Sequence, residues 1–254
     1  MLERSTLIIV FSSALFAILA VLQATRDVIP ISIISAGLYV GDTLFHEIGH
    51  SIFAWVFGVP SIPAIFTLFG ADQSGGVTLM WDRQIIFQIL ALIGLSYFCY
   101  RLRNEYSPFF IYALIFTIFI SILAVTGYYQ LIIGYMGHGS SILIGGFFLF
   151  RAWVNIQARH TFERWLNGLF GTFLIFSNFM FSYRLVFDSI GRWEYSQSVS
   201  GIGHHDFVKI ANQLNLVDVQ IIAWITMFLS VSTLIMATIF AVRYKSQLKR
   251  NSSY

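Results

Sequence analysis

Charged residues and cysteine are both scarce in this chain of 254 residues. Only 11% of the residues are charged, whereas a soluble domain carries about 25%, so the charge supply is too small to cover a soluble surface of this length. The single cysteine, Cys99, excludes a disulfide framework and any zinc or iron–sulfur site built from several cysteines. Metal chemistry in this protein therefore depends on His, Asp and Glu.

Apolar residues are abundant instead. They make up 57% of the chain, with 26 Phe, and the mean hydropathy is +0.75. This composition is typical of a protein that crosses a lipid bilayer several times. The 15 Lys and Arg residues are scattered over short loops and do not gather in one basic segment, so we expect the bilayer, and no nucleic acid, as a partner.

Seven stretches of the sequence are long and apolar enough to cross a bilayer, which needs about 20 helical residues. They are Thr6–Gln23, Pro30–Phe57, Gln84–Tyr100, Pro108–Gly127, Tyr128–Trp153, Phe162–Asp188 and Val217–Tyr244. The fourth and fifth stretches meet at Gly127, through either a tight turn or one long broken helix. The expected fold class is all-α, a polytopic bundle of about seven membrane helices that forms one domain over residues 1–254.

The basic residues predict the orientation of this bundle. Ten of the 15 fall in loops on the side of the C-terminus, and five fall on the other side. The positive-inside rule then predicts a cytoplasmic C-terminus. We expect a multi-pass protein of the plasma (inner) membrane. No A-x-A cleavage site follows the first stretch, which we expect to remain as an uncleaved anchor.

The second stretch contains the motif His46-Glu47-Ile48-Gly49-His50. Two His four residues apart lie on one helix face and can bind one zinc ion, and Glu47 can take a proton from a zinc-bound water. Asp42 is either an outer-shell partner that holds the His46 imidazole or a polar contact at the helix start. The alternative for the whole motif is hydrogen bonding among helices without a metal, because ionisable groups in an apolar span are costly unless paired or functional.

A catalytic zinc site needs a third protein ligand. His138, in a stretch rich in small residues, is either a contact to the metal or to an oxyanion, or a packing His. Asp206 is either the third ligand or the N-cap of the amphipathic segment that follows it. We favour Asp206, because a carboxylate offsets the charge of zinc in a low-dielectric site, with His205, His204 and His138 as alternates. Four spans lie between His50 and this cluster, and an even number of crossings returns the chain to the same side.

These motifs resemble the site-2 protease group of intramembrane metalloproteases, peptidase family M50, and particularly its small M50B-like branch. The resemblance covers residues 42–214 in patches: His46–His50, Phe57–Val59, Ile65–Phe69, Ser74–Thr78, Gly134–Gly146 and Asp206–Ala211. It implies a metalloprotease core over about residues 30–215, one Zn2+ ion, and a short hairpin that dips into the membrane after the zinc-binding helix. The Asp-Gly motif that supplies the third ligand in typical members is absent, and the Asp206 segment resembles the late Asp-containing motif of the branch.

The resemblance implies an intramembrane zinc endopeptidase that hydrolyses peptide bonds of membrane-anchored protein substrates. The substrate must be unwound, and an edge strand of the hairpin would pair with it while glycines allow the turn. The residues expected to contact the substrate are Ile65, Phe66, Thr67, Leu68, Gly75 and Gly76. Two alternatives stay open: a membrane zinc hydrolase acting on lipid amides or esters, and a non-catalytic membrane binding or scaffold protein.

Overall fold

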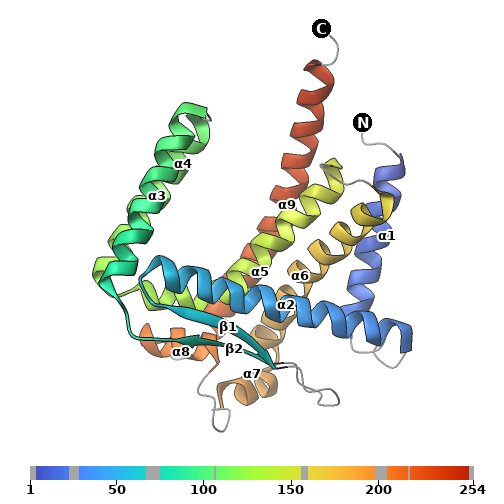
Figure 1. Ribbon diagram of the computed structural model, residues 1–254. Coiled ribbons are helices and arrows are strands. Elements are labelled where there is room, and N and C mark those ends of the chain that lie inside the picture. The colour runs from blue at the N-terminus through green and yellow to red at the C-terminus, as the bar shows by residue number, and fades with distance from the viewer. Residues whose placement is uncertain are drawn as a thin grey trace. The chain divides into compact units, whose positions relative to one another are not determined.

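The computed structural model describes residues 4–22, 29–66, 75–105, 107–155, 160–197, 205–216 and 218–251. These residues form nine α-helices and one two-stranded sheet (Figure 1). The elements are α1 (Arg4–Val21), α2 (Ile29–Val56), β1 (Ser61–Phe66), β2 (Gly75–Met80), α3 (Ile85–Glu105), α4 (Ser107–Thr126), α5 (Tyr129–Val154), α6 (Thr161–Phe187), α7 (Ser189–Ser196), α8 (Asp206–Gln213) and α9 (Gln220–Asn251).

The chain divides into two compact units. The first unit comprises Met1–Phe45 and His138–Tyr254, and the second unit comprises His46–Gly137. Two helices, α2 and α5, each run without a break from one unit into the other. The two units are described separately below.

Each of the seven predicted spans is a helix, namely α1 to α6 and α9. Five of them, α1, α3, α5, α6 and α9, are long and apolar enough to cross a membrane, so the chain has the helices of a membrane protein. Within the described residues α4 contributes a shorter apolar helix, Ala113–Thr126. Helix α2 carries four ionisable groups, namely Asp42 and the His46, Glu47 and His50 of the H-E-x-x-H motif. That α2 and α4 also cross the membrane stays a prediction.

In the first unit, α6 packs against both α1 and α9. One part of the core lies where α1, α2 and α6 meet, and its buried residues are Ala17, Ala20, Val21, Leu38, Leu169 and Phe173. The buried Arg164 of α6 joins these helices to the end of α5: its guanidinium donates to the carbonyl oxygens of Ala152 (2.5 Å) and Trp153 (3.2 Å) and to Thr6 Oγ1 (2.7 Å). The last carbonyls of a helix have no partner within that helix, so Arg164 supplies the donors that the end of α5 needs.

In the second unit, a β-hairpin follows α2, as the resemblance predicts. Strands β1 and β2 pair antiparallel, from Ser61 opposite Met80 to Phe66 opposite Gly75. Gly58, with φ of +78°, ends α2 in the left-handed conformation that glycine adopts without strain. The buried residues of this unit's core come from the end of α2, the residues just after it, α4 and α5: Ala54, Phe57, Val59, Ile120, Ala124 and Ile133.

The junction of the fourth and fifth predicted spans is a tight turn. Helix α4 ends at Thr126 and α5 begins at Tyr129, and Gly127 between them has φ of +80°. A right-handed helix cannot continue through this φ value, so the alternative of one long broken helix is excluded.

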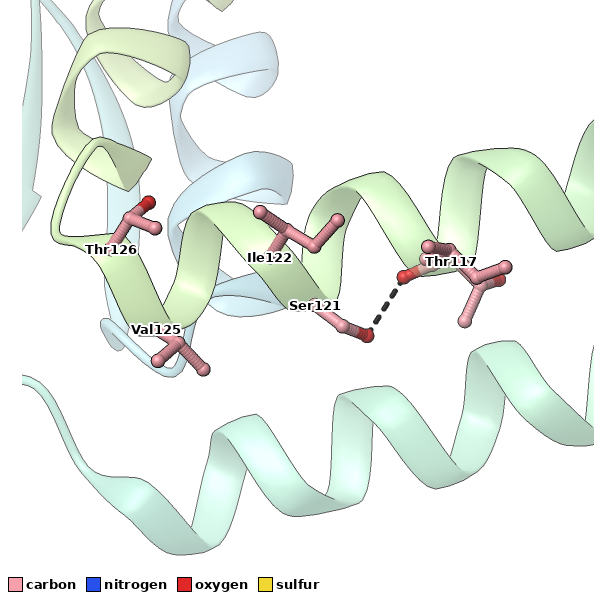
Figure 2. A pocket seen from close by; sticks show the side chains of 6 residues that line it. Thr117, Ser121, Ile122, Val125 and Thr126 are labelled. Atoms are coloured by element: carbon pink, nitrogen blue, oxygen red, sulfur yellow. Dashed lines mark hydrogen bonds between the residues drawn. The ribbon is translucent and has the colours of Figure 1, made fainter.

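A shallow depression of about 470 Å3 on α4 is lined by Thr117, Ile118, Ser121, Ile122, Val125 and Thr126 (Figure 2). Its hydroxyl groups are paired within the helix, since Ser121 Oγ donates to the Thr117 carbonyl (2.8 Å) and Thr117 Oγ1 donates to the Ala113 carbonyl (2.8 Å). None of the six lining side chains is acidic, basic or aromatic.

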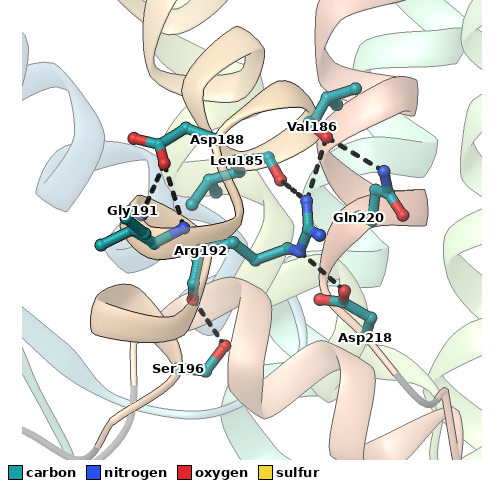
Figure 3. A network of polar contacts seen from close by, with 9 residues as sticks. Leu185, Val186, Asp188, Gly191, Arg192, Ser196, Asp218 and Gln220 are labelled. Carbon is teal, nitrogen blue, oxygen red and sulfur yellow. Dashed lines mark hydrogen bonds and ion pairs between the residues drawn. The ribbon is translucent and has the colours of Figure 1, made fainter.

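A polar network joins the end of α6, helix α7 and the start of α9 (Figure 3). Arg192 Nη1 donates to the carbonyl oxygens of Leu185 (2.8 Å) and Val186 (3.0 Å), and Arg192 Nε lies 2.8 Å from Asp218 Oδ2. Asp188 caps α7 by accepting from two backbone N–H groups, and the bond from Gly191 lowers the pKa of the Asp188 carboxyl. Arg192 therefore connects α7 to the end of α6 and to Asp218, which precedes α9.

Replacing Arg192 should destabilise the first unit. In Arg192→Ala the buried Leu185 and Val186 carbonyls each lose a donor and Asp218 loses its cation, which we expect to cost about 1–3 kcal/mol. Arg192→Lys keeps the positive charge but loses the several N–H donors of the guanidinium, so its loss of stability should be smaller than that of Arg192→Ala. Thermal unfolding in detergent measures the effect, with the exposed Arg243→Ala as control; equal midpoints for Arg192→Ala and Arg243→Ala would contradict the prediction.

Candidate metal site

The two His side chains of the motif on α2 face each other in the second unit. His46 Nε2 and His50 Nε2 are 3.0 Å apart, with the ring planes at 82°. His50 Nδ1 donates to the carbonyl oxygen of Ile133 (2.6 Å), which leaves the lone pair of the neutral ring on Nε2. Two nitrogen ligands of a tetrahedral zinc ion are separated by roughly 3.3 Å, so this pair is close to the spacing that one ion requires.

Glu47 lies beside this pair and is held by the hairpin. Its side chain is buried, and its Oε2 accepts a hydrogen bond from Thr78 Oγ1 of β2 (2.6 Å). Thr78 Oγ1 also lies 3.2 Å from the Glu47 carbonyl oxygen. Thr78 falls in one of the segments that carry the family resemblance, but its sequence position alone assigns it no role. The only feature of the sequence that could have indicated the contact with Glu47 is a hydroxyl-bearing residue on a strand that follows the motif.

Gly137 of α5 brings a bare backbone against the two imidazoles. A Cβ atom at this position would lie 2.5 Å from His46 Nε2 and 2.5 Å from His50 Nε2, closer than real Cβ contacts come. Gly137 belongs to the stretch of small residues around His138, and at this position the lack of a side chain lets α5 lie against the two rings. Any side chain at this position would enter the space between the two imidazole nitrogens and α5.

In the first unit, His138 and Asp206 lie close together. Their possible ligand atoms are within 4.8 Å of one another. His138 Nδ1 is 2.7 Å from Asn178 Oδ1 of α6, and its ring packs against Phe181 and Phe207, with centroids 5.0 and 4.7 Å away. The first unit thus holds a second pair of groups of the kinds that can ligate a metal.

Asp206 is the first residue of α8, and the N-cap position belongs to His205. The hypothesis that Asp206 is the N-cap therefore does not match the structure, in which the carboxylate lies 3.7 Å from Lys209 Nζ.

The His205 ring stacks on the Tyr195 ring, with the ring centroids 4.3 Å apart. Burial, followed by the nearby Asp206 carboxylate, raises the pKa of the Tyr195 hydroxyl, so this phenol is neutral. His204, an alternate ligand, lies outside the described residues.

Asp42 is tied to α6 and α5 within the first unit. Its Oδ2 accepts from Ser177 Oγ (2.9 Å), and its carbonyl oxygen accepts from Ser141 Oγ at the limit of hydrogen bonding (3.5 Å). One of the two hypotheses for Asp42 was a polar contact at the start of its helix. The observed partners, Ser177 and Ser141, instead lie on neighbouring helices. Its role as an outer-shell partner of His46 stays a prediction.

Four of the six residues predicted to contact substrate lie within the described part of the chain. Ile65 and Phe66 form the end of β1, opposite Gly76 and Gly75 at the start of β2. Both glycines are strand residues, so they do not form the turn itself. Thr67 and Leu68 lie outside the described residues.

The donors present suit a zinc ion: imidazole nitrogens whose lone pairs are set by hydrogen bonds, and a carboxylate. Three residues that support them, Thr78, Gly137 and Asn178, carry no motif of their own. Comparisons of the chain with models of known protein families, with curated proteins and with solved structures gave no match.

Proposed function

We propose that this chain is an intramembrane zinc-dependent endopeptidase that hydrolyses peptide bonds of membrane-anchored protein substrates. The observation that carries the proposal is the arrangement on α2, where two imidazole Nε2 atoms 3.0 Å apart lie next to a buried carboxylate held by Thr78. In H-E-x-x-H metalloproteases the two His bind zinc and the Glu is the general base. The resemblance to the M50B-like branch adds the membrane setting, and the apolar helices agree with it.

The ligands that we propose for this one Zn2+ ion are His46, His50 and Asp206. Asp206 is favoured because its carboxylate is not at the N-cap position and lies within 4.8 Å of His138. His205, His204 and His138 remain the alternates.

The chemistry of this site would be hydrolysis with Glu47 as the proton carrier. A bound zinc ion would supply Lewis-acid activation of the scissile carbonyl and of a water molecule. Thr78 holds Oε2 of Glu47, so Oε1 takes the proton as the water oxygen bonds to the carbonyl carbon. Glu47 then gives this proton to the leaving nitrogen as the C–N bond breaks. Water is the only co-reactant, and atoms and charge balance.

The substrate of such a site must be extended, because helical hydrogen bonds and packing shield the peptide carbonyl. The end of β1 at Ile65 and Phe66 is the edge with which we propose that the unwound segment pairs. The proposed setting is the plasma (inner) membrane, crossed seven times, with the C-terminus in the cytoplasm. The excess of basic residues on the C-terminal side supports this orientation.

The ligand set is tested by zinc stoichiometry and affinity in purified variants. We expect His46→Ala and His50→Ala to lose bound zinc. In Asp206→Asn the affinity should fall by more than the roughly 10–100-fold that is typical of losing an outer-shell partner, because a neutral amide is a poor zinc donor. Chelator competition measures this fall.

The matched control is Asp188→Asn, in which the helix cap of α7 is replaced by a residue that caps about as well, so zinc affinity should not change. An Asp206→Asn protein that keeps its zinc and its activity would move the third ligand to a histidine. Parallel incubation with single-span peptides and with labelled lipids separates proteolysis from lipid hydrolysis, and cleavage of lipids alone would contradict the proposed substrate.

A further inference from the structure

We propose that the short helix α7 lies in the headgroup region of the bilayer, with Ile190 and Trp193 inserted between the lipid chains. The residues that carry this inference all belong to the first unit, and the inference does not depend on the proposed zinc chemistry. It depends on an exposed apolar face of α7, on the place where the uncharged part of α6 ends, and on the aromatic rings around that place.

The outward face of α7 is apolar. Ile190 is 69% exposed and Trp193 is 65% exposed, and residues three positions apart are neighbours on one helix face. We call these two residues the apolar pair. The exposed Ser196 follows on the flank of this face. A helix with an apolar strip on its outer side and polar residues beside it is typical of helices that lie in the membrane interface.

The inward face of α7 is already occupied by protein. Gly191 is buried, Arg192 donates to two carbonyl oxygens at the end of α6 (Figure 3), and the Tyr195 ring stacks on the His205 ring. A rotation of α7 that buried the apolar pair would break these contacts. The apolar pair therefore stays on the outside of the first unit.

The uncharged part of α6 ends directly before α7. Arg164 and Arg184 lie 20 positions apart with no charged residue between them, which corresponds to about 30 Å along a helix, the thickness of the hydrocarbon core. Charged side chains are costly inside that core, so its boundary lies near Arg184. Asp188, with φ of −105° and ψ of 104°, ends α6 and caps α7, so α7 begins just outside this boundary and does not continue the direction of α6.

Aromatic rings surround the end of α6 at the same level. The Tyr183 and Phe187 ring centroids are 4.7 Å apart, and the Phe187 ring lies 5.5 Å from the Trp224 ring of α9. All three side chains are exposed. Trp and Tyr are enriched at the membrane–water interface because their rings are apolar and carry one polar atom. The aromatic cluster thus marks the interface on two helices, beside the start of α7.

The charged groups beside the apolar pair also suit the headgroup layer. Arg184 Nη2 lies 3.0 Å from Glu194 Oε2, and Arg184 Nε lies 3.6 Å from Asp188 Oδ2. These side chains are about half exposed, so they need the water and polar groups that headgroups supply and that the hydrocarbon core lacks. An interfacial helix buries its apolar face by about 5–10 Å at this boundary, which is the depth we expect for the apolar pair.

Nitroxide labels on the full chain in phospholipid vesicles test this depth. The variants are Ile190→Cys, Trp193→Cys and Ser196→Cys, each combined with Cys99→Ser because Cys99 is the only cysteine. Collisions with oxygen, which concentrates in lipid, and with a nickel chelate, which stays in water, report the depth of each label. We expect the labels at 190 and 193 about 5–10 Å inside the boundary between headgroups and chains, and the label at 196 in greater contact with the nickel chelate.

Phe228→Cys is the reference for the hydrocarbon core, because Phe228 is 71% exposed in the uncharged part of α9. Its label should lie deeper than those on α7. Tryptophan fluorescence gives a second measurement that needs no label. Trp193→Phe should lower the fraction of the fluorescence that is quenched by lipids brominated close to the headgroup, whereas Trp153→Phe, which removes a buried indole, should not lower it.

Contact with the nickel chelate at 190 and 193 equal to or greater than that at 196 would overturn the inference. Labels at 190 and 193 that are shielded from both oxygen and the nickel chelate would also overturn it, since that result would show that protein, and not lipid, covers the apolar pair. An unchanged or higher quenched fraction in Trp193→Phe would contradict the insertion of Trp193.

Discussion

Glu47→Gln should abolish cleavage of a single-span substrate while zinc stays bound. The amide has the size of the carboxylate and still accepts the hydrogen bond from Thr78 Oγ1, but it cannot take a proton from the attacking water. Loss of a general base costs about 100- to 10,000-fold in rate. Glu47 is not a proposed ligand, so the zinc content per chain should equal that of the wild type. Turnover with purified protein and zinc stoichiometry on the same sample give the two measurements.

The matched control for this substitution is Glu163→Gln on α6. Glu163 is partly exposed and pairs with Arg151 at 3.3 Å, and an exposed ion pair contributes about 1 kcal/mol or less, so turnover should not change. Thr78→Val should give an intermediate loss, because the base is kept but its Oε2 is no longer held. Wild-type turnover in Glu47→Gln would exclude Glu47 as the base and with it the proposed mechanism.

Gly137→Ala should eliminate zinc binding and activity together. The added methyl group would lie 2.5 Å from Nε2 of both His46 and His50, so the imidazoles or α5 must move apart. Overpacking of this kind costs about 1–3 kcal/mol in stability, and it displaces the two nitrogens that the ion needs. Zinc stoichiometry after dialysis and the midpoint of thermal unfolding measure the two consequences.

Gly94→Ala on α3 is the matched control, since Gly94 is also helical and a Cβ atom there meets no atom within 4 Å. Alanine favours a helix over glycine by about 1 kcal/mol, so Gly94→Ala should be neutral or slightly stabilising and should keep its zinc. A Gly137→Ala protein with full zinc content would show that α5 does not approach the His pair as closely as described.

The sequence by itself predicted the long helices and the pairing of His46 with His50 in the candidate metal site. Runs of apolar residues place each helix, because a span must pair all its backbone groups internally and expose apolar side chains. The four-residue spacing of His46 and His50 puts them on one face through helix geometry alone. The hairpin after α2 followed from the family resemblance, and it is present as β1 and β2. The short helix α7 carries no long apolar run and was not predicted.

Only the tertiary structure decided which side chains support these groups. Thr78 reaches Glu47 across 31 residues and Asn178 reaches His138 across 40, and neither pair has a spacing that a helix or strand period encodes. In the sequence nothing distinguishes Gly137 from the other small residues near it. The structure shows that it lies against the imidazoles of His46 and His50. Local sequence determines periodicity and hence which face a residue occupies, whereas contacts between elements depend on how all the faces pack at once, which is the physical reason these partners emerged from the fold alone.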